Sequence, residues 1–206
     1  MCASFQARFN LTQLVRLFEQ ARAPLAFDGG RPNIELVDEV RPTDPSLAVR
    51  ARDGAGPESE ATVELVAMRF GFPPPAPKRP PVINFRSEGR RFSNGPAGGR
   101  ALVPVSGFYE FTGTTYPKTR WLLEGVDGEP LALAAVWRAG PAGDAFSLLT
   151  AEPGPDVAPY HSRGVLPLPV SLWADWLFDR RPAEALLSPP AAGTLIATPA
   201  PRPDKK

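Results

Sequence analysis

Proline is the residue that most limits what this chain of 206 residues can fold into, because it occurs 27 times. Proline interrupts helix interiors and central strands, so the chain is expected to consist of short elements with many connections and few long helices. Six of the nine residues from Pro73 to Pro81 are prolines, which predicts a stiff, extended connector. The core must therefore be built from short apolar segments on either side of this connector.

The apolar segments after residue 45 are separated by Gly, Asp and Pro turns. Their spacing favours an antiparallel, barrel-like sheet over alternating β-α-β units. The expected strands are Ser46–Ala51, Thr62–Phe70, Val82–Phe85, Ala101–Val105, Phe108–Thr112, Arg120–Gly125, Leu131–Trp137 and Phe146–Ala151. We predict one domain over residues 1–198 and a disordered tail, rich in Pro and Lys, over residues 199–206.

A few short helices are expected to flank this sheet, which makes the predicted class α+β. Helical spacing of apolar residues begins at Leu11 and continues to Phe18, with Asn10 or Thr12 as the cap and Pro24 as the stop. Two further short helices are expected at Ser171–Phe178 and Ala183–Leu187, and residues 23–44 are expected to be loop with at most one short strand.

The single cysteine, the single histidine and the lack of a long apolar run argue against several classes of protein. One cysteine excludes an intramolecular disulfide, and one cysteine with one histidine excludes a Cys/His zinc site, so neither a metal nor another cofactor is expected. The sequence has no apolar run of about 18 residues and no secretory signal pattern. We therefore expect a cytoplasmic protein that does not span a membrane.

Charge is nearly balanced overall but not locally. The formal net charge of +1 argues against a globally basic nucleic-acid-binding protein. Between Lys78 and Arg100, however, six basic residues accompany a single acid, Glu88. This segment is either a patch that faces phosphates or a solvated loop that happens to be rich in arginine.

Cys2 is the chain's only cysteine and directly follows Met1. If Met1 is removed, which a small second residue normally permits, Cys2 carries both an α-amine and a thiol, groups whose ordinary pKa values are about 8. Such a 1,2-aminothiol can convert an aldehyde into an imine and then close a thiazolidine ring. The alternative is that Cys2 is a chance residue on a frayed terminus.

Polar residues in otherwise apolar segments are the other candidates for chemistry. Asn84 and Arg86 are two apart and so share one face of a strand, and Thr150 ends a strand on a hydroxyl. Glu110 stands among aromatic residues, where a carboxyl tends to have a raised pKa and can move protons. His161 is the only histidine. The structural alternatives are an amide that caps a turn, a carboxylate paired at the surface and a polar histidine in the core.

Four motifs occur in one order along the chain, and together they resemble the SRAP (SOS response-associated peptidase) family. They are Met1-Cys2-Ala3-Ser4-Phe5, Asn84-Phe85-Arg86-Ser87-Glu88, Pro104-Val105-Ser106-Gly107-Phe108-Tyr109-Glu110-Phe111 and His161-Ser162-Arg163. The resemblance extends from Cys2 to about Phe178. It places the only cysteine and the only histidine at motif positions.

The resemblance implies a sensor of abasic sites in single-stranded DNA that traps the ring-opened sugar as a thiazolidine, a lyase-like reaction. It also implies a monomer that has autoproteolytic cysteine peptidase activity and whose partner is single-stranded DNA. By position, Cys2 would be the nucleophile, and Asn84 would hold its α-amine. Glu110 and His161 would move protons, Arg86 and Arg163 would bind phosphates, and Thr150 and Pro42 would line the pocket.

Two departures from the family pattern lie near the predicted nucleophile. Ala3-Ser4 replaces Gly-Arg and so removes a cation, and Glu39 aligns with an amide position. DNA binding is therefore predicted to be weaker and more local than in relatives that keep the arginine.

Three other functions compete with this interpretation. An N-terminal-nucleophile amidohydrolase would also expose Cys2, but nothing beyond Met1-Cys2 resembles one. A peptidase could pair Cys2 with His161 and orient the pair with Asn84 or Glu110. A single-strand-binding protein without covalent chemistry would stack bases on Trp, Phe and Arg side chains.

Overall fold

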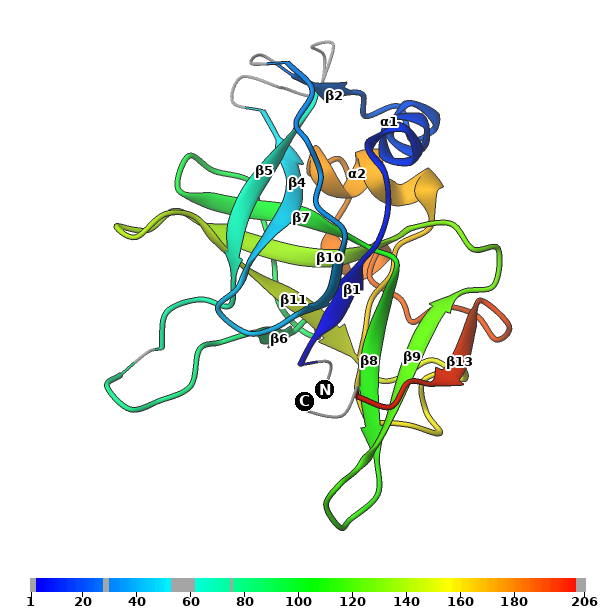
Figure 1. The fold of residues 1–206 in the computed structure, drawn as a ribbon. Helices are drawn as coiled ribbons and strands as arrows, with labels where there is room; N and C mark the ends of the chain where they lie inside the picture. Colours follow the sequence, from blue (N-terminus) through cyan, green and yellow to red (C-terminus); the bar gives the residue numbers. More distant parts are fainter. Residues whose placement is uncertain (1–2, 28–29, 53–61, 75, 203–206) are drawn as a thin grey trace.

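The computed structural model describes residues 3–27, 30–52, 62–74 and 76–202, which form two sheets and a few short helices (Figure 1). The first sheet has five strands in the order β13-β9-β8-β1-β3. Their bounds are Phe5–Ala7 for β1, Val37–Val40 for β3, Gly107–Thr112 for β8, Thr119–Gly125 for β9 and Leu195–Pro199 for β13. The first strand of the chain therefore lies inside this sheet, between β3 and β8.

The second sheet has eight strands and closes on itself. Its main order is β12-β11-β10-β7-β4-β5-β2, β6 pairs with β11, and a further pairing of β5 with β11 joins β5, β4, β7, β10 and β11 into a ring. The bounds are Leu25–Ala26 (β2), Pro45–Ala51 (β4), Val63–Phe70 (β5), Asn84–Arg86 (β6), Gly98–Val105 (β7), Leu131–Arg138 (β10), Ala145–Ala151 (β11) and Gly164–Val165 (β12).

The predicted α+β class with a mainly antiparallel, barrel-like sheet is confirmed. All eight predicted strands are present with shifts of up to three residues at their ends, the largest at Ala101–Val105, which is observed as Gly98–Val105. Three of the pairings are parallel, namely β2–β5, β5–β11 and β6–β11. The β5–β11 pairing closes the ring and the β6–β11 pairing attaches β6 to it, which the expected meander alone would not do.

The main helix, α1 (Leu11–Gln20), begins with a capping box in which Asn10 and Gln13 bond each other's backbone N–H. Asn10 is therefore the cap, Thr12 lies inside the helix, and the helix ends before Pro24. The helix predicted at Ser171–Phe178 is a 3₁₀ turn, Val170–Leu172, followed by the α-helix α2, Trp173–Leu177. The one predicted at Ala183–Leu187 is a 3₁₀ turn, Ala183–Ala185.

Part of the predicted disordered tail is ordered. Pro199 ends β13, and the backbone of Ala200 exchanges hydrogen bonds with Arg120, accepting from its Nε at 2.7 Å and donating to its carbonyl oxygen at 2.9 Å. Pairing with β9 therefore extends through Ala200, into the segment predicted to be the tail, and residues 203–206 lie outside the described residues. The single-domain assignment of residues 1–198 stays a prediction.

An aromatic cluster joins the two sheets next to the N-terminal strand. The ring centroid of Phe5 in β1 lies 5.2 Å from that of Phe70 in β5 and 6.4 Å from that of Phe146 in β11. All three side chains are fully buried, and aromatic pairs at such separations stabilise a core beyond the area that they bury. This packing fixes β1 against the barrel and so sets where the chain enters the candidate site.

Arg100, one of the basic residues that the sequence assigned to either a phosphate-facing patch or a solvated loop, is instead a buried structural residue. Its side chain is 2% exposed, and its Nη2 pairs with Asp179 at 2.6 Å. The Nε atom donates to the Phe92 carbonyl oxygen at 2.8 Å, and Nη1 donates to that of Arg181 at 2.9 Å. The patch interpretation is therefore wrong for this residue, since its charge is used to join β7 to the segment after α2.

We expect Arg100→Met to destabilise the fold by about 3 kcal/mol, because it removes a buried cation and leaves Asp179 and the carbonyl oxygens of Phe92 and Arg181 without their donor. Urea unfolding followed by tryptophan fluorescence would measure the change. Arg16→Met is the control, because it removes an exposed pair with Glu129 and should change stability by less than about 1 kcal/mol. Equal effects of the two substitutions would contradict the assigned role.

Candidate functional site

Glu110 is a carboxyl group buried in β8. Its side chain follows Phe108 and precedes Thr112 on one face of the strand, and it is 1% exposed. Burial penalises the charged form and raises the pKa of Glu110 to about 7. Near neutral pH this group can therefore both donate and accept a proton.

Cross-strand packing brings His161 to the same place as Glu110. Trp121 of β9 lies opposite Glu110 in the β8–β9 ladder. The Trp121 ring packs on Tyr160 with centroids 5.0 Å apart, and Tyr160 directly precedes His161. As a result, Glu110 and His161 line one cavity of about 860 Å³, together with residues that include Lys118, Arg120 and Arg202.

The ring of His161 is held by the backbone of Arg163. Its Nδ1 atom lies 2.9 Å from the backbone N of Arg163 and 3.1 Å from its carbonyl oxygen. Burial lowers the pKa of His161, which favours the neutral ring at pH 7. The neutral ring can accept from the N–H at Nδ1, and the protonated ring can donate to the carbonyl, so this pair of backbone groups suits either state.

The buried carboxyl makes stability depend on pH in a predictable direction. The pKa of Glu110 rises from 4.5 to about 7 on folding. The contribution of Glu110 to the free energy of unfolding is therefore fully present below pH 4.5 and is lost as the pH rises through 7. Glu110→Gln imitates the protonated form. We expect its stability relative to wild type to rise by about 3 kcal/mol between these limits.

Urea unfolding below pH 4.5 and above pH 7 would measure this difference. The exposed carboxylate of Glu129 supplies a matched control, because Glu129→Gln should give a much flatter pH dependence. A constant difference between wild type and Glu110→Gln at all pH values would show that Glu110 has an ordinary pKa.

Asn84, Arg86 and Thr150 come together because β6 pairs with β11. Asn84 lies beside Leu148, and Arg86 lies beside Thr150 in this parallel register. The Thr150 hydroxyl is buried and donates to the Phe85 carbonyl oxygen at 3.2 Å. The two candidate residues of β6 are therefore fixed by strand pairing, with Arg86 exposed and Asn84 half-buried.

Arg163 connects this strand pair to the histidine segment. Its guanidinium donates to both oxygens of Glu88, at 2.5 and 2.9 Å, and Nη2 also donates to the Thr150 carbonyl oxygen at 2.8 Å. The hydrogen bonds from Arg163 lower the pKa of Glu88 to about 2. Arg163 is thus engaged by protein groups, and its role toward phosphates stays a prediction.

Of the predicted site residues, Glu110 and His161 line the cavity, whereas Asn84, Arg86, Thr150 and Arg163 gather at the β6–β11 strand pair and do not line it. Pro42 lies in the turn between β3 and β4 and is not among the described residues that line the cavity. Cys2 lies outside the described residues. Ser4, two positions later in the sequence, accepts a hydrogen bond from the backbone N of Tyr109 at 3.0 Å, so the described chain enters the first sheet beside the neighbour of Glu110.

Lys118, Arg120 and Arg202 were missed as possible site residues. Lys118 directly precedes β9, Arg120 lies near its start, and Arg202 follows β13. Arg120 could be placed near Glu110 only with knowledge of the β8–β9 register, in which Arg120 lies opposite Phe111. The position of Arg202 depends on a strand that the sequence pattern did not predict.

The described parts of the chain contain no group of three or more His, Cys, Asp or Glu side chains that could hold a metal ion. Within the same parts, no helix has the length and apolar character needed to cross a membrane.

The model of the family described as SOS response associated peptidase (SRAP) matches residues 1–202. The chain belongs to the SRAP family. Membership supports a peptidase-like role associated with DNA damage. A search of curated proteins finds no match.

Three of the solved structures that share this fold come from two bacteria. A Bordetella bronchiseptica protein has a TM-score of 0.71 at 22% identity, covering 98% of this chain and 100% of its own. A phage-related protein of the same organism has a TM-score of 0.67 at 18% identity, covering 98% and 95%. A Bacteroides thetaiotaomicron protein has a TM-score of 0.58 at 15% identity, covering 79% and 77%. At these identities the likenesses show the fold alone.

Proposed function

We propose that this SRAP protein detects abasic sites in single-stranded DNA and forms a covalent thiazolidine link to them through Cys2 after removal of Met1. It acts as a monomer in the cytoplasm. The observation that carries the proposal is the hydrogen bond between Tyr109 N and Ser4 O. It fixes the N-terminal strand beside Glu110, a proton-transfer group that shares its cavity with His161.

The chemistry needs an aldehyde, an amine and a thiol. The ring-opened abasic sugar presents the aldehyde, and the α-amine of Cys2 adds to it and releases one water to give an imine. The thiol of Cys2 then adds across the C=N bond, so that a C–S bond forms and the thiol proton moves to nitrogen. No oxidant or cofactor is needed, because the ring closure is an addition.

The described side chains supply the proton transfers and the binding contacts in this proposal. Glu110, with a pKa raised to about 7, donates a proton to the hydroxyl that leaves as water when the imine forms. In the reverse reaction it accepts a proton from the water that adds to the imine. His161 assists ring opening of the sugar and the reverse reaction. Asn84 holds the α-amine, Arg86 and Arg163 bind flanking phosphates, and Thr150 and Pro42 shape the pocket.

The test is to incubate the purified protein with a single strand that carries one abasic site. We expect a covalent adduct that survives denaturation, and intact mass should show protein that lacks Met1. Adduct formation by a population that retains Met1 would contradict the mechanism. If no adduct forms although the strand binds, the protein is a single-strand-binding module.

A peptidase activity limited to the protein's own N-terminus is the second candidate. It is favoured by the lowered pKa of His161, since a neutral imidazole can act as the base for a thiol. Protein synthesised with a short leader before Cys2 should lose that leader, and His161→Ala should retain it. Equal processing of both proteins would exclude His161 as the base.

A further inference from the structure

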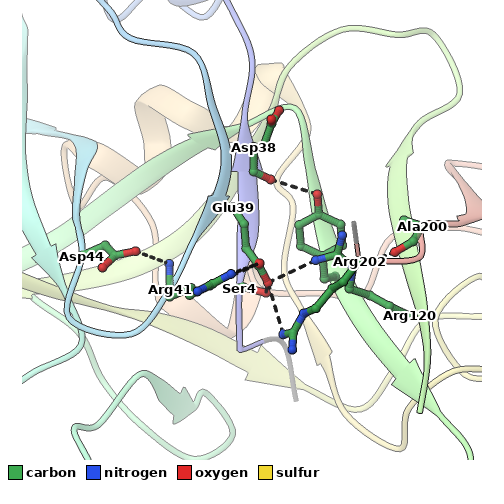
Figure 2. Close-up of polar contacts among 9 residues, drawn as sticks. Ser4, Asp38, Glu39, Arg41, Asp44, Arg120, Ala200 and Arg202 are labelled. Atoms are coloured by element: carbon green, nitrogen blue, oxygen red, sulfur yellow. Dashed lines mark hydrogen bonds and ion pairs between the residues drawn. The ribbon is translucent and has the colours of Figure 1, made fainter. Parts of the chain in front are cut away.

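Glu39 lies at the centre of a cluster of basic side chains from three separate segments (Figure 2). One oxygen of Glu39 lies 2.8 Å from Nη2 of Arg41, and the other lies 3.3 Å from Nη1 of Arg120 and 3.5 Å from Nη2 of Arg202. The Ser4 hydroxyl donates to the same carboxylate at 3.0 Å. One negative charge thus faces three positive charges.

The carboxylate is well buried and remains ionised. The side chain of Glu39 is 12% exposed. Burial alone would raise the pKa of Glu39, but hydrogen bonds from Arg41 and Ser4 hold it below its usual value. The group is therefore a permanent anion at neutral pH, surrounded as a bound phosphate would be.

The three arginines differ in how firmly the protein holds them and in how exposed they are. Arg120 is fixed, because its guanidinium packs on the Tyr109 ring at 4.2 Å and donates to the Ala200 carbonyl oxygen. Arg202 is 51% exposed, and Arg41 is 63% exposed. Arg120 and Arg202 also line the cavity that holds Glu110 and His161. The cluster therefore borders the proposed site and is reachable from it.

We propose that Arg41, Arg120 and Arg202 form a phosphate-binding site for the nucleic-acid strand, and that Glu39 with Ser4 occupies this site until a backbone phosphate replaces the carboxylate. The inference rests on the proposed function for its ligand. Guanidinium groups bind carboxylates and phosphates through the same fork of N–H donors, so one anion can take the place of the other. Glu39 then limits affinity for DNA, and removing its charge strengthens binding.

The test is equilibrium binding of an undamaged, dye-labelled single strand, measured by fluorescence anisotropy over a range of salt concentrations. We expect Glu39→Gln to bind about tenfold more tightly, the size of one charge-assisted contact. The log–log salt slope should steepen by about 0.7 for each additional phosphate that the protein binds. Arg202→Ala in the Glu39→Gln background should reverse part of both changes.

Glu129→Gln is the charge-matched control, because it also removes one acid and releases one arginine, Arg16, beyond the far end of β9. Equally tightened binding by Glu39→Gln and Glu129→Gln would overturn the inference, as would unchanged or weaker binding by Glu39→Gln. If Glu39→Gln fails to fold, binding of the undamaged strand by Arg202→Ala tests the inference instead. Its exposed side chain can be removed from folded protein, and unchanged binding would overturn the inference.

Free phosphate separates a defined site from a general charge effect. Replacing chloride by inorganic phosphate at equal ionic strength should reduce the affinity advantage of Glu39→Gln over wild type, and an unaffected advantage would overturn the inference. An undamaged strand carries no aldehyde, so this measurement is independent of crosslinking. Tighter binding by Glu39→Gln together with no adduct on an abasic strand would refute the proposed function and leave the phosphate site in place.

Discussion

Cys2→Ala is expected to abolish the denaturation-stable adduct with an abasic single strand. Alanine keeps the α-amine but removes the sulfur that closes the ring, so the reaction stops at an imine. Borohydride should still trap this imine, because it reduces the C=N bond to a stable amine. Denaturing gel electrophoresis with and without borohydride separates the two products.

Cys2→Ser is the matched variant for this experiment. Serine can close only an oxazolidine, which reverses more readily, so its adduct should be lost on heating while the wild-type adduct persists. Undamaged strand should give no product with any variant, because it presents no aldehyde. A stable adduct formed by Cys2→Ala would show that another residue is the nucleophile.

Glu110→Gln and His161→Ala should each slow adduct formation or its reversal by about 10²–10⁴-fold, the usual contribution of a general acid–base group. The pKa of Glu110 is raised to about 7, so the wild-type rate should change across neutral pH. That change should be absent from Glu110→Gln. Single-turnover rates over a pH series would measure both effects.

The site of attachment should remain Cys2 in both variants, since neither residue supplies the nucleophile. Glu129→Gln, which changes an exposed acid away from the cavity, should react at the wild-type rate. A loss of tenfold or less in Glu110→Gln and His161→Ala would mean that protons move through other groups.

The long strands could be predicted from the sequence, and most of the short ones could not. Val63–Phe70, Leu131–Arg138 and Ala145–Ala151 are apolar runs with clear turn signals at their ends. Phe5–Ala7 and Gly164–Val165 are too short to show any periodicity, and they exist only because a neighbouring strand offers backbone partners. The closing β5–β11 pairing is likewise a long-range contact with no local signal.

Likewise, some residues of the candidate site could be predicted from the sequence and others could not. Glu110 and His161 stand out in the sequence as a lone carboxyl among aromatics and the only histidine, and the structure places both on one cavity. Arg100 was misassigned because a charge count cannot tell a buried ion pair from a solvated one. The arginine cluster around Glu39 could not be predicted, because its members are joined by tertiary contacts between distant segments.

The interior position of β1 has a consequence for biosynthesis. Phe5 pairs with Phe108 of β8, roughly 100 residues further along, which a ribosome adds over about 5–20 s at about 5–20 residues per second. During that interval β1 can pair with β3 but has no β8 on its other side, so the N-terminal strand cannot yet be enclosed within the sheet. The proposed removal of Met1 therefore has time to be completed before β1 is enclosed between β3 and β8.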